Sequence, residues 1–351
     1  MFNIIQKRKI WFSFSGLLIL ISLLALIFWG LKLGIDFTGG SLLELKFTDR
    51  VLSNAEINEA LAELELPYLN IQSTSANGVI LKTKALSESE HQEIIKKLLS
   101  VFDENLVEQA EGITVTPEQL GLEGEGLEGL QITASGEGAD LIKEQQKLPQ
   151  LNPEIVSQYL EELRFDSIGP TIGKELQQKA VYAIIIVLLA IIFYIAYAFR
   201  KVSHPVESWK YGLSAVVALA HDILIVTGIF SILGHFFDYQ VDTLFVTALL
   251  TILGFSVHDT IVTFDRIREN LHYHQDKTFE EAINISVNQT IIRSLNTSTT
   301  TLFVLVAIYL FGGETIKQFV LALMLGVVIG TYSSIFLASP LLMVWYRFKK
   351  Y

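Results

Sequence analysis

Long apolar runs dominate this chain and are separated by polar segments, one of which is very long. Each of six runs is long enough to cross the roughly 30 Å hydrocarbon core of a bilayer as a helix. The runs are Ile10–Leu31, Ala180–Phe199, Tyr211–Leu233, Thr243–Phe264, Leu295–Phe311 and Phe319–Trp345. The fifth run is the shortest, and we expect its helix to begin earlier, near Ile291. The pattern predicts a bundle of six membrane-spanning helices.

The polar block between the first two runs has the pattern of a small α+β domain. Ser53 with Glu56, and Ser87 with Glu90, have capping-box spacing and predict helices to about Glu65 and Phe102. Asn77-Gly78 predicts a hairpin turn. The predicted strands are Ser41–Asp49, Tyr68–Ser75, Val79–Ala85 and Leu163–Ile168. The resulting order, β-α-β-β-α-β, is that of a ferredoxin-like domain.

Composition separates the two parts further. The chain has 351 residues, of which 51% are hydrophobic and 18% charged, as is typical of a membrane protein. Residues 31–178 contain 11 basic and 26 acidic residues, a net charge of −15. An acidic domain repels nucleic acid, which disfavours that class of partner. The chain has no cysteine, so disulfides and thiolate metal sites are excluded.

Basic residues predict the orientation in the membrane, because cytoplasmic loops are enriched in Lys and Arg. They gather before the first run, after the second and fourth, and after the last, whereas the alternate loops contain only Lys317. Both termini are therefore expected in the cytoplasm and the polar block outside. We expect an uncleaved first span in residues 1–31, an external domain in 32–178 with a Gly-rich acidic insertion near 120–140, five spans in 179–346 and a basic tail in 347–351.

Asp259 is the strongest candidate for chemistry. Its run, Thr243–Phe264, contains no other ionisable residue except His258. A charge at the centre of a lipid-facing helix costs roughly 2.5–3.5 kcal/mol on insertion scales, and such residues usually mark ion pathways. Arg293 lies at the edge of the next, antiparallel run and is expected at a similar depth. An Asp259–Arg293 pair would offset both desolvation costs, and protonation of Asp259 would break it.

Other interpretations of these residues stay open at this stage. The Asp259–Arg293 pair is alternatively a structural bridge, and Asp222 is a second proton-relay candidate or a hydrogen-bonding residue. His258 titrates nearer neutrality and is a candidate relay, although packing is the better interpretation for both His258 and His221. Metal binding is disfavoured, because adjacent helical residues point about 100° apart. No ATP-binding signature occurs, so energy would come from an ion gradient or a partner.

Three further motifs bear on the helix bundle. Gly326 and Gly330 form a GxxxG spacing that favours close helix packing. The hydroxyl-rich stretch Thr297–Thr301 either bonds back to its own helix or lines a wet path. A charged cytoplasmic turn follows Asp259, with i,i+3 spacing for the pairs Asp265–Arg268 and Arg266–Glu269.

Four stretches, which span nearly the whole chain, resemble the SecF family of the bacterial SecD–SecF protein-export complex. The stretches are Gly34-Ile-Asp-Phe-Thr-Gly-Gly40, Ser167-Ile-Gly-Pro-Thr-Ile-Gly-Lys-Glu-Leu176, the segment from Gly254 through His258-Asp259 to Asn270, and Arg293-Ser-Leu-Asn-Thr-Ser-Thr-Thr-Thr301. The resemblance implies an RND-like half-transporter in the bacterial inner membrane. It also implies that Asp259 and Arg293 belong to a proton path, with weaker support for Asp222.

The resemblance further implies partners and a mode of action. These are a SecD-like subunit, the SecYEG channel and YajC, with exported unfolded polypeptide as the substrate, proton-motive force as the energy source and no cofactor. The motif residues at the membrane–domain joints form a hinge or a rigid connector; they are Gly34, Asp36, Gly39, Gly40, Gly169, Pro170 and Gly173. The alternatives are a self-contained RND-type small-solute exporter and a passive scaffold. The coupling ion is H⁺ or, alternatively, Na⁺.

Overall fold

The computed structural model describes residues 2–74, 77–103, 106–107, 151–198, 206–273 and 276–348. It divides into two compact units, Met1–Phe37 with Glu175–Tyr351, and Thr38–Lys174. We call them the membrane unit and the α/β domain. The predicted acidic insertion near 120–140 lies outside the described residues, as do Arg200, Lys201, Lys349 and Lys350 of the basic clusters.

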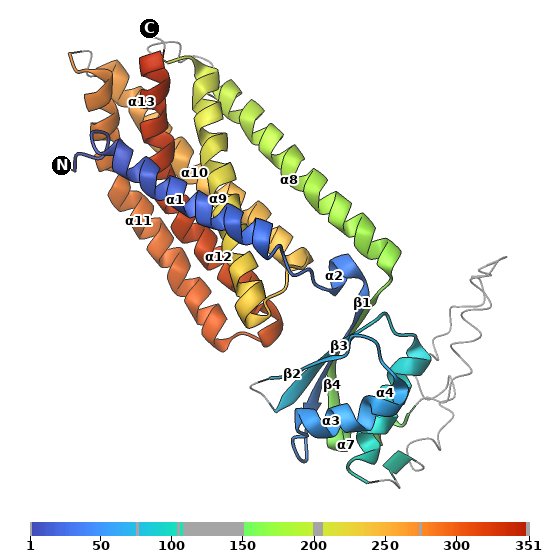
Figure 1. Cartoon of the computed structure of the whole chain (residues 1–351). Coiled ribbons are helices and arrows are strands. Elements are labelled where there is room, and N and C mark those ends of the chain that lie inside the picture. The colour runs from blue at the N-terminus through green and yellow to red at the C-terminus, as the bar shows by residue number, and fades with distance from the viewer. Residues whose placement is uncertain are drawn as a thin grey trace, which may run out of the picture. The chain divides into compact units, whose positions relative to one another are not determined.

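Among the described residues, six helical segments are long and apolar enough to span a membrane, which confirms the predicted bundle. The first five are α1 (Arg8–Phe28), α8 (Pro170–Ala198), α9 (Ser208–Phe237), α10 (Thr243–Tyr273) and α11 (Phe279–Phe311). The sixth consists of α12 (Glu314–Ser333), a π-helical turn (Ser334–Ala338) and α13 (Ser339–Phe348) (Figure 1). A short helix, α2 (Ile35–Thr38), follows α1.

The helix α11 begins well before the predicted start near Ile291. Its first turn is opened by a capping box in which the Thr278 hydroxyl accepts from the Glu281 N–H and the Glu281 carboxylate accepts from the Thr278 N–H. This box satisfies helix-end donors that are otherwise unpaired, so the helix extends past the apolar run into polar sequence. Hydrophobicity alone did not predict this extension.

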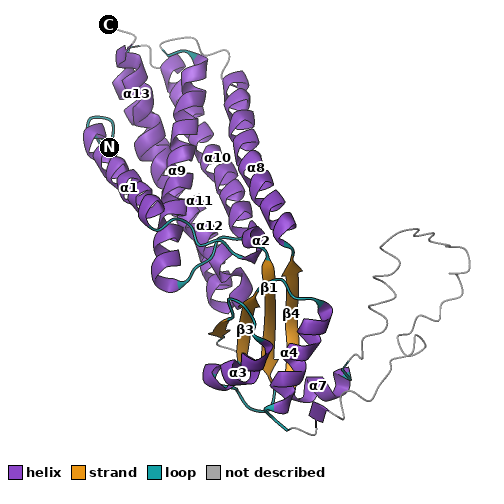
Figure 2. Ribbon diagram, turned by 45° about the vertical axis from the view of Figure 1, so that its right-hand side comes forward, coloured by secondary structure: helices purple, strands orange, loops and turns teal. Residues whose placement is uncertain are grey.

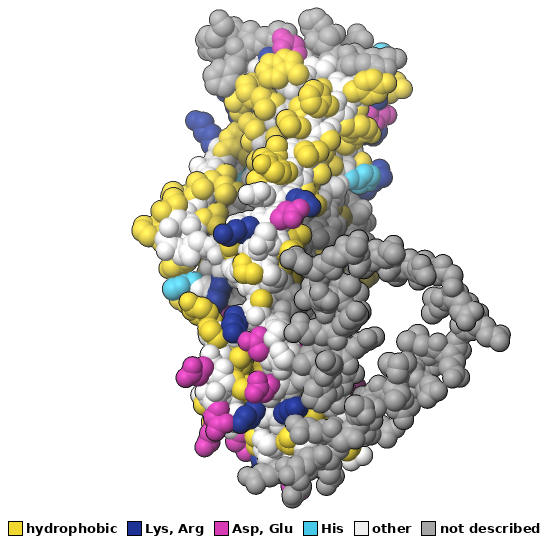
Figure 3. Space-filling view, turned by 90° about the vertical axis from the view of Figure 1, so that its right-hand side faces the viewer, with side chains coloured by type: hydrophobic (Ala, Val, Ile, Leu, Met, Phe, Trp, Pro, Cys, Tyr) yellow, Lys and Arg dark blue, Asp and Glu magenta, His cyan; other side chains and the backbone are white. Residues whose placement is uncertain are grey.

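The membrane helices differ greatly in how much of their surface is covered. Within the apolar window of each span, 56% of the residues are buried in the last span and 50% in α9, but only 6% in α8. Hydrophobic side chains cover the membrane helices on the face seen in Figure 3. α9 and the last span therefore form the centre of the bundle, and α8 presents its apolar surface outward.

The predicted close approach at Gly326 and Gly330 is confirmed. A Cβ added at Gly326 would lie 2.2 Å from Ile252 Cδ1, and one added at Gly330 would lie 2.9 Å from Ser256 Cβ. Both contacts are with α10, so the two glycines let α12 pack directly against the helix that carries Asp259.

The two ends of the chain meet at the start of α11. Glu280 Oε1 lies 3.9 Å from Arg8 Nη1, and Glu280 Oε2 lies 3.8 Å from Arg347 Nη2. The Asn288 side chain also accepts from Phe2 N at 2.7 Å. The start of α1, the start of α11 and the end of α13 therefore lie at one end of the bundle (Figure 1).

The α/β domain has the predicted ferredoxin-like element order, with an additional helix, α7, directly before the last strand. The elements are β1 (Gly40–Phe47), α3 (Asn54–Leu61) with a 3₁₀ turn (Ala62–Leu64), β2 (Asn70–Ser73), β3 (Gly78–Thr83), α4 (Glu88–Ser100), α7 (Pro153–Tyr159) and β4 (Leu160–Ile168). The strands pair antiparallel in the order β2-β3-β1-β4, with helices on one face (Figure 2). Leu43, Leu45 and Leu81 point from the sheet into a core shared with Ile94 and Leu98 of α4.

Both predicted capping boxes form in this domain. At the start of α4, the Ser87 N–H donates to Glu90 at 2.8 Å, and Ser87 Oγ accepts from Glu90 N at 3.4 Å. The bond from the Ser87 N–H, with further bonds from Lys84 and the Ser87 hydroxyl, lowers the pKa of Glu90 to about 2. The box therefore fixes the start of α4 at neutral pH.

His91, in the first turn of α4, is a buried titratable group that makes this domain pH-sensitive. Its ring stacks on Phe165 of β4 at a centroid distance of 3.9 Å, and its Nε2 lies 3.2 Å from Glu162 Oε2. Burial opposes protonation of His91, but the bonds and charges of Glu162 and Glu88 outweigh burial and raise its pKa above the usual value. The fold thus favours the protonated ring.

We expect the stability of the α4–β4 contact to decrease as pH rises. Because the pKa of His91 is higher in the folded than in the unfolded chain, its protonation stabilises the fold. This stabilisation is complete below the unfolded-state pKa of about 6.5 and is lost as the pH rises through the folded-state pKa. Hydrogen exchange of α4 and β4 amides, corrected for the intrinsic effect of pH, should show decreasing protection across this range. His91→Gln should abolish the decrease, and an unchanged pH profile in that variant would contradict the assignment.

Candidate functional site

Asp259 lies in α10 and is held by hydroxyl groups from two other segments. Ser294 Oγ of α11 donates to Asp259 Oδ1 at 2.5 Å, and Ser334 Oγ of the π-helical turn donates to Asp259 Oδ2 at 2.8 Å. Asp259 is half-buried, whereas Ser294 and Ser334 are buried. Each carboxylate oxygen thus links α10 to a different neighbouring segment.

The predicted Asp259–Arg293 ion pair is not formed within the described part of the chain. The depth was predicted correctly, because Ser294, the next residue after Arg293, reaches Asp259. The side of α11 that faces Asp259 was not predicted correctly, because neighbouring residues of a helix point about 100° apart. Ser294 therefore faces α10 in the bundle, and the side chain of Arg293 is exposed.

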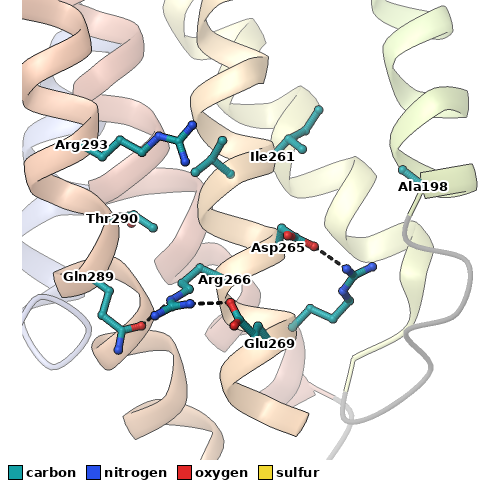
Figure 4. Close-up of a pocket in the computed structure, with 10 residues that line it drawn as sticks. Ala198, Ile261, Asp265, Arg266, Glu269, Gln289, Thr290 and Arg293 are labelled. Carbon is teal, nitrogen blue, oxygen red and sulfur yellow. Dashed lines mark hydrogen bonds and ion pairs between the residues drawn. The ribbon is translucent and has the colours of Figure 1, made fainter. Parts of the chain in front are cut away.

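Arg293 instead lines an open cavity of about 480 Å³ between the C-terminal part of α10 and the N-terminal part of α11, with Ala198 of α8 also in its lining. Figure 4 shows its side chain extending from α11 toward α10. The predicted charged turn lies at the other side of this cavity. Arg268 Nη2 is 2.6 Å from Asp265 Oδ1, and Arg266 pairs with Glu269 and bonds to Gln289, which confirms both predicted i,i+3 pairs.

Asp222 of α9 is the second intramembrane acid, and it is fully buried. Its Oδ2 accepts from Ser256 Oγ of α10 at 2.6 Å and from Ser333 Oγ of α12 at 2.8 Å. Its Oδ1 lies 2.9 Å from Nδ1 of the buried His221. Asp222 therefore joins α9, α10 and α12 in the centre of the bundle.

Ser333 and Ser334 stand where the last span changes from α-helix to π-helix. Pro340 follows the π-helical turn, and a proline has no N–H to donate and sterically excludes the carbonyl four residues before it. A π-helical turn accommodates that defect, and such turns are frequent at functional sites. Ser339 Oγ donates to the Ser334 carbonyl at 3.1 Å and satisfies one backbone acceptor there.

The remaining predicted relay positions have local partners or face outward. His258 is exposed on α10. In the hydroxyl-rich stretch, Thr297 bonds to the Arg293 carbonyl and Thr301 to the Thr297 carbonyl, which favours the interpretation that these groups bond back to their own helix. The described residues contain no cluster of three or more His, Cys, Asp or Glu side chains able to hold a metal.

The motif after the first span is tied to the start of α10. Asp36 Oδ2 accepts from Thr243 N at 2.9 Å and from the Thr243 hydroxyl, so it caps this helix. Gly34 N donates to Val241 O at 2.8 Å, beside a bridge between Leu33 and Val241. Asp36 is thus a helix-capping residue, a role that its motif did not reveal.

The other motif glycines lie where the α/β domain joins its two connections. Gly40 of β1 pairs with Ile168 of β4, and Gly39 has φ +76°. Gly173 N donates to Gly169 O at 3.1 Å in the first turn of α8. The alternatives of a hinge and a rigid connector at these joints both stay predictions.

Gly39→Ala is expected to destabilise the α/β domain strongly. A Cβ there would lie 2.8 Å from Pro170 Cα, and a positive φ costs a residue with a Cβ about 1–2 kcal/mol. Gly169→Ala is the matched control, because a Cβ at Gly169 meets nothing within 4 Å. Thermal unfolding should show a much lower midpoint for Gly39→Ala than for Gly169→Ala; equal midpoints would contradict the packing at this joint.

A bundle of six spans with an antiparallel α+β domain between the first two, and with hydroxyl-bound carboxylates inside it, defines a multi-pass membrane protein of the transporter type. Comparison with protein families agrees with this class of protein. Residues 150–348 match the family described as "Protein export membrane protein SecD/SecF, C-terminal", and residues 25–49 match the "SecD/SecF GG Motif".

Individual relatives extend the similarity to almost the whole chain. Protein translocase subunit SecF of Thermobaculum terrenum is 40% identical over 98% of this chain and 94% of the relative. The SecF subunit of Synechocystis sp. is 36% identical over 95% and 91%. The crystal structure of SecDF from Thermus thermophilus superposes with a TM-score of 0.71 at 26% identity, over 99% of this chain and 39% of that longer one. The chain belongs to the SecF subunits of the SecD/SecF protein-export family.

Proposed function

We propose that this chain assists Sec-dependent protein export by coupling it to proton movement through its membrane helices. SecF-family membership makes it a transport component rather than a catalytic enzyme. The observation that carries the proton proposal is the environment of Asp259. Its carboxylate accepts hydroxyl bonds from two neighbouring segments, and the described residues place no cation within ion-pair distance of it.

This environment supports a protonation cycle. The Asp259 carboxylate can take up and release a proton, and its two hydrogen-bond donors are uncharged hydroxyls. The ionised form accepts both serine bonds, whereas the protonated form has one oxygen that itself donates. Proton uptake would therefore weaken the links from α10 to Ser294 and Ser334 and let α11 and the last span shift. Proton release would restore both links.

We place proton exit on the side of the charged cavity. The cavity opens beside Arg293 at the end of the bundle where Glu280 joins Arg8 and Arg347. Clustered basic residues at that end support a cytoplasmic position for both termini. The α/β domain would then face the exported chain. The occurrence of fused SecDF relatives supports a SecD-like subunit as the partner, and we extend the assembly to the SecYEG channel and YajC.

Arg293→Met is expected to lower proton-driven translocation. A permanent positive charge near the exit favours ionised Asp259 and therefore proton release, although no direct pair holds it. Arg293→Lys keeps the charge and should retain more activity than Arg293→Met. The measurement is the rate of translocation at a fixed pH gradient, and equal rates for wild type and Arg293→Met would remove Arg293 from the mechanism.

The experiment that tests the function compares ion gradients. The chain, its SecD-like partner and the export channel are reconstituted in liposomes, and translocation is measured with a pH gradient, a Na⁺ gradient or neither. We expect a pH gradient alone to accelerate translocation and a proton uncoupler to remove the effect. If only the Na⁺ gradient accelerates translocation, the coupling ion is Na⁺ and not H⁺. Equal translocation rates under all conditions would contradict ion coupling and leave only a scaffold role for the chain.

A further inference from the structure

Two acids on different helices, the buried Asp222 and the half-buried Asp259, are bound by successive residues of the last span. Ser333 Oγ donates to Asp222 Oδ2 at 2.8 Å, and Ser334 Oγ donates to Asp259 Oδ2 at 2.8 Å. Ser334 is the first residue of the π-helical turn, and Ser333 is the last residue of α12. A displacement of this turn would therefore act on both carboxylates together.

Each of these serines also has a second acceptor within reach. Ser333 Oγ lies 3.1 Å from the Gly330 carbonyl, and Ser334 Oγ lies 3.0 Å from the Thr331 carbonyl. A hydroxyl has a single hydrogen, so full donation to one acceptor weakens donation to the other. An ionised carboxylate is the stronger acceptor, whereas a protonated one competes poorly with a helix carbonyl. Each serine hydroxyl can therefore donate either to its acid or to a helix carbonyl, and the charge of the acid decides between the two.

We propose that Asp222 is a second proton-holding site, coupled to Asp259 through Ser333 and Ser334 as positioning residues. This inference rests on the proposed function of Asp259. When Asp259 takes up a proton, Ser334 turns to the Thr331 carbonyl and the π-helical turn adjusts, which changes the position of Ser333 against Asp222. The proton affinity of Asp222 then depends on whether Asp259 is charged.

The surroundings of Asp222 stabilise its ionised form, so the loss of one donor would favour proton uptake. His221 Nδ1 lies 2.9 Å from Asp222 Oδ1, whereas His221 Nε2 is buried with no hydrogen-bond partner among the described residues. A neutral ring that donates from Nδ1 leaves Nε2 as a bare acceptor, which avoids an unpaired buried N–H. Asp222 is thus given three donors inside the bundle.

Within the described part of the chain, few other titratable groups lie close to these two acids. Near Asp222 they are His221 on α9 itself and Tyr332 on α12, whose ring lies 6.2 Å from that of His221; α1 contributes Ser15, which is bonded to the Tyr332 hydroxyl. α10 contributes Ser256. Near Asp259, His258 and Arg293 are both exposed, on α10 and α11 respectively.

The test is an infrared pH titration of carboxyl groups in the full chain, reconstituted with its partner in liposomes. Asp222→Asn and Asp259→Asn identify each signal by its loss. In the wild-type serine background, Asp259→Asn should shift the midpoint of Asp222 by about one pH unit, a tenfold change in proton affinity. In Ser333→Ala/Ser334→Ala the same substitution should shift it by less than about a third of that.

Ser294→Ala is the matched control. It removes the other hydroxyl donor of Asp259 but leaves the π-helical turn intact, so the midpoint of Asp222 should still respond to Asp259→Asn. The single variants Ser333→Ala and Ser334→Ala serve if the double variant does not fold. An Asp222 midpoint that ignores Asp259, or coupling that survives removal of both serines, would overturn the inference. Failure of the proposed function is separate, because it appears as gradient-driven translocation that persists in Asp259→Asn.

Discussion

Asp259→Asn is expected to reduce translocation in a pH gradient to the rate measured without one. Asparagine has nearly the same size, and its amide oxygen still accepts a bond from Ser294 or Ser334, so one of the two serine bonds is kept and the bundle stays folded. It cannot take up or release a proton. The loss should therefore affect the whole gradient-dependent part of the rate and leave the gradient-independent part.

Asp276→Asn provides the control for this variant. It removes the same charge from an exposed residue before α11, outside the membrane helices, and the gradient effect should be retained. Both variants are compared with wild type in the same liposomes, with and without an uncoupler. Gradient stimulation of normal size in Asp259→Asn would exclude this carboxylate as the coupling site.

The position of Asp259 could be predicted from the sequence because an acid in an apolar run is conspicuous, but its partners could not. Hydrophobic periodicity fixes the depth of a residue to within about a turn, whereas a rotation of 100° per residue decides which neighbour faces inward. Ser294 and Arg293 differ by one such step, and the charge of Arg293 made it the more obvious partner. A serine in an apolar run carries no charge that would mark it as a partner in the sequence. Its role is seen only from the packing of α10 against α11.

The π-helical turn could not be predicted from the sequence for a related reason. Pro340 indicates a defect in the last span, and the sequence permits either a kink or a widened turn. Which one forms depends on what the displaced residues can bind. Here Ser333 and Ser334 bind acids on two other helices, so the contacts between segments select the widened turn.

The glycine contacts between helices likewise include some that the sequence predicts and one that it does not. Gly326 and Gly330 were predictable because both small residues lie on one helix at a recognised spacing. Gly228 of α9 was not, because the small residue that meets it, Ser22, lies on α1. A contact between single small residues on two helices leaves no periodic pattern in either one.

Gly228→Ala is therefore expected to be among the most damaging single-methyl additions in the bundle. A Cβ there would lie 2.3 Å from Ser22 Cβ and 2.5 Å from Ser22 Cα. Because the second atom is backbone, rotation of a side chain cannot relieve the clash, and α1 must move away from α9. That movement would also stretch the bond from Ser231 Oγ to Ala25 O, now 2.9 Å. Overpacking of this kind costs about 1–3 kcal/mol or more.

Gly254→Ala separates this clash from the general effect of alanine in a helix. A Cβ at Gly254 meets nothing within 4 Å, so that variant should gain roughly 0.5–1 kcal/mol from helix propensity alone. Thermal unfolding of the two variants in the same detergent should move the midpoint in opposite directions. Since both substitutions carry the same gain in propensity, the difference between them measures the contact of α1 with α9, and a difference near zero would show that α1 is not held there.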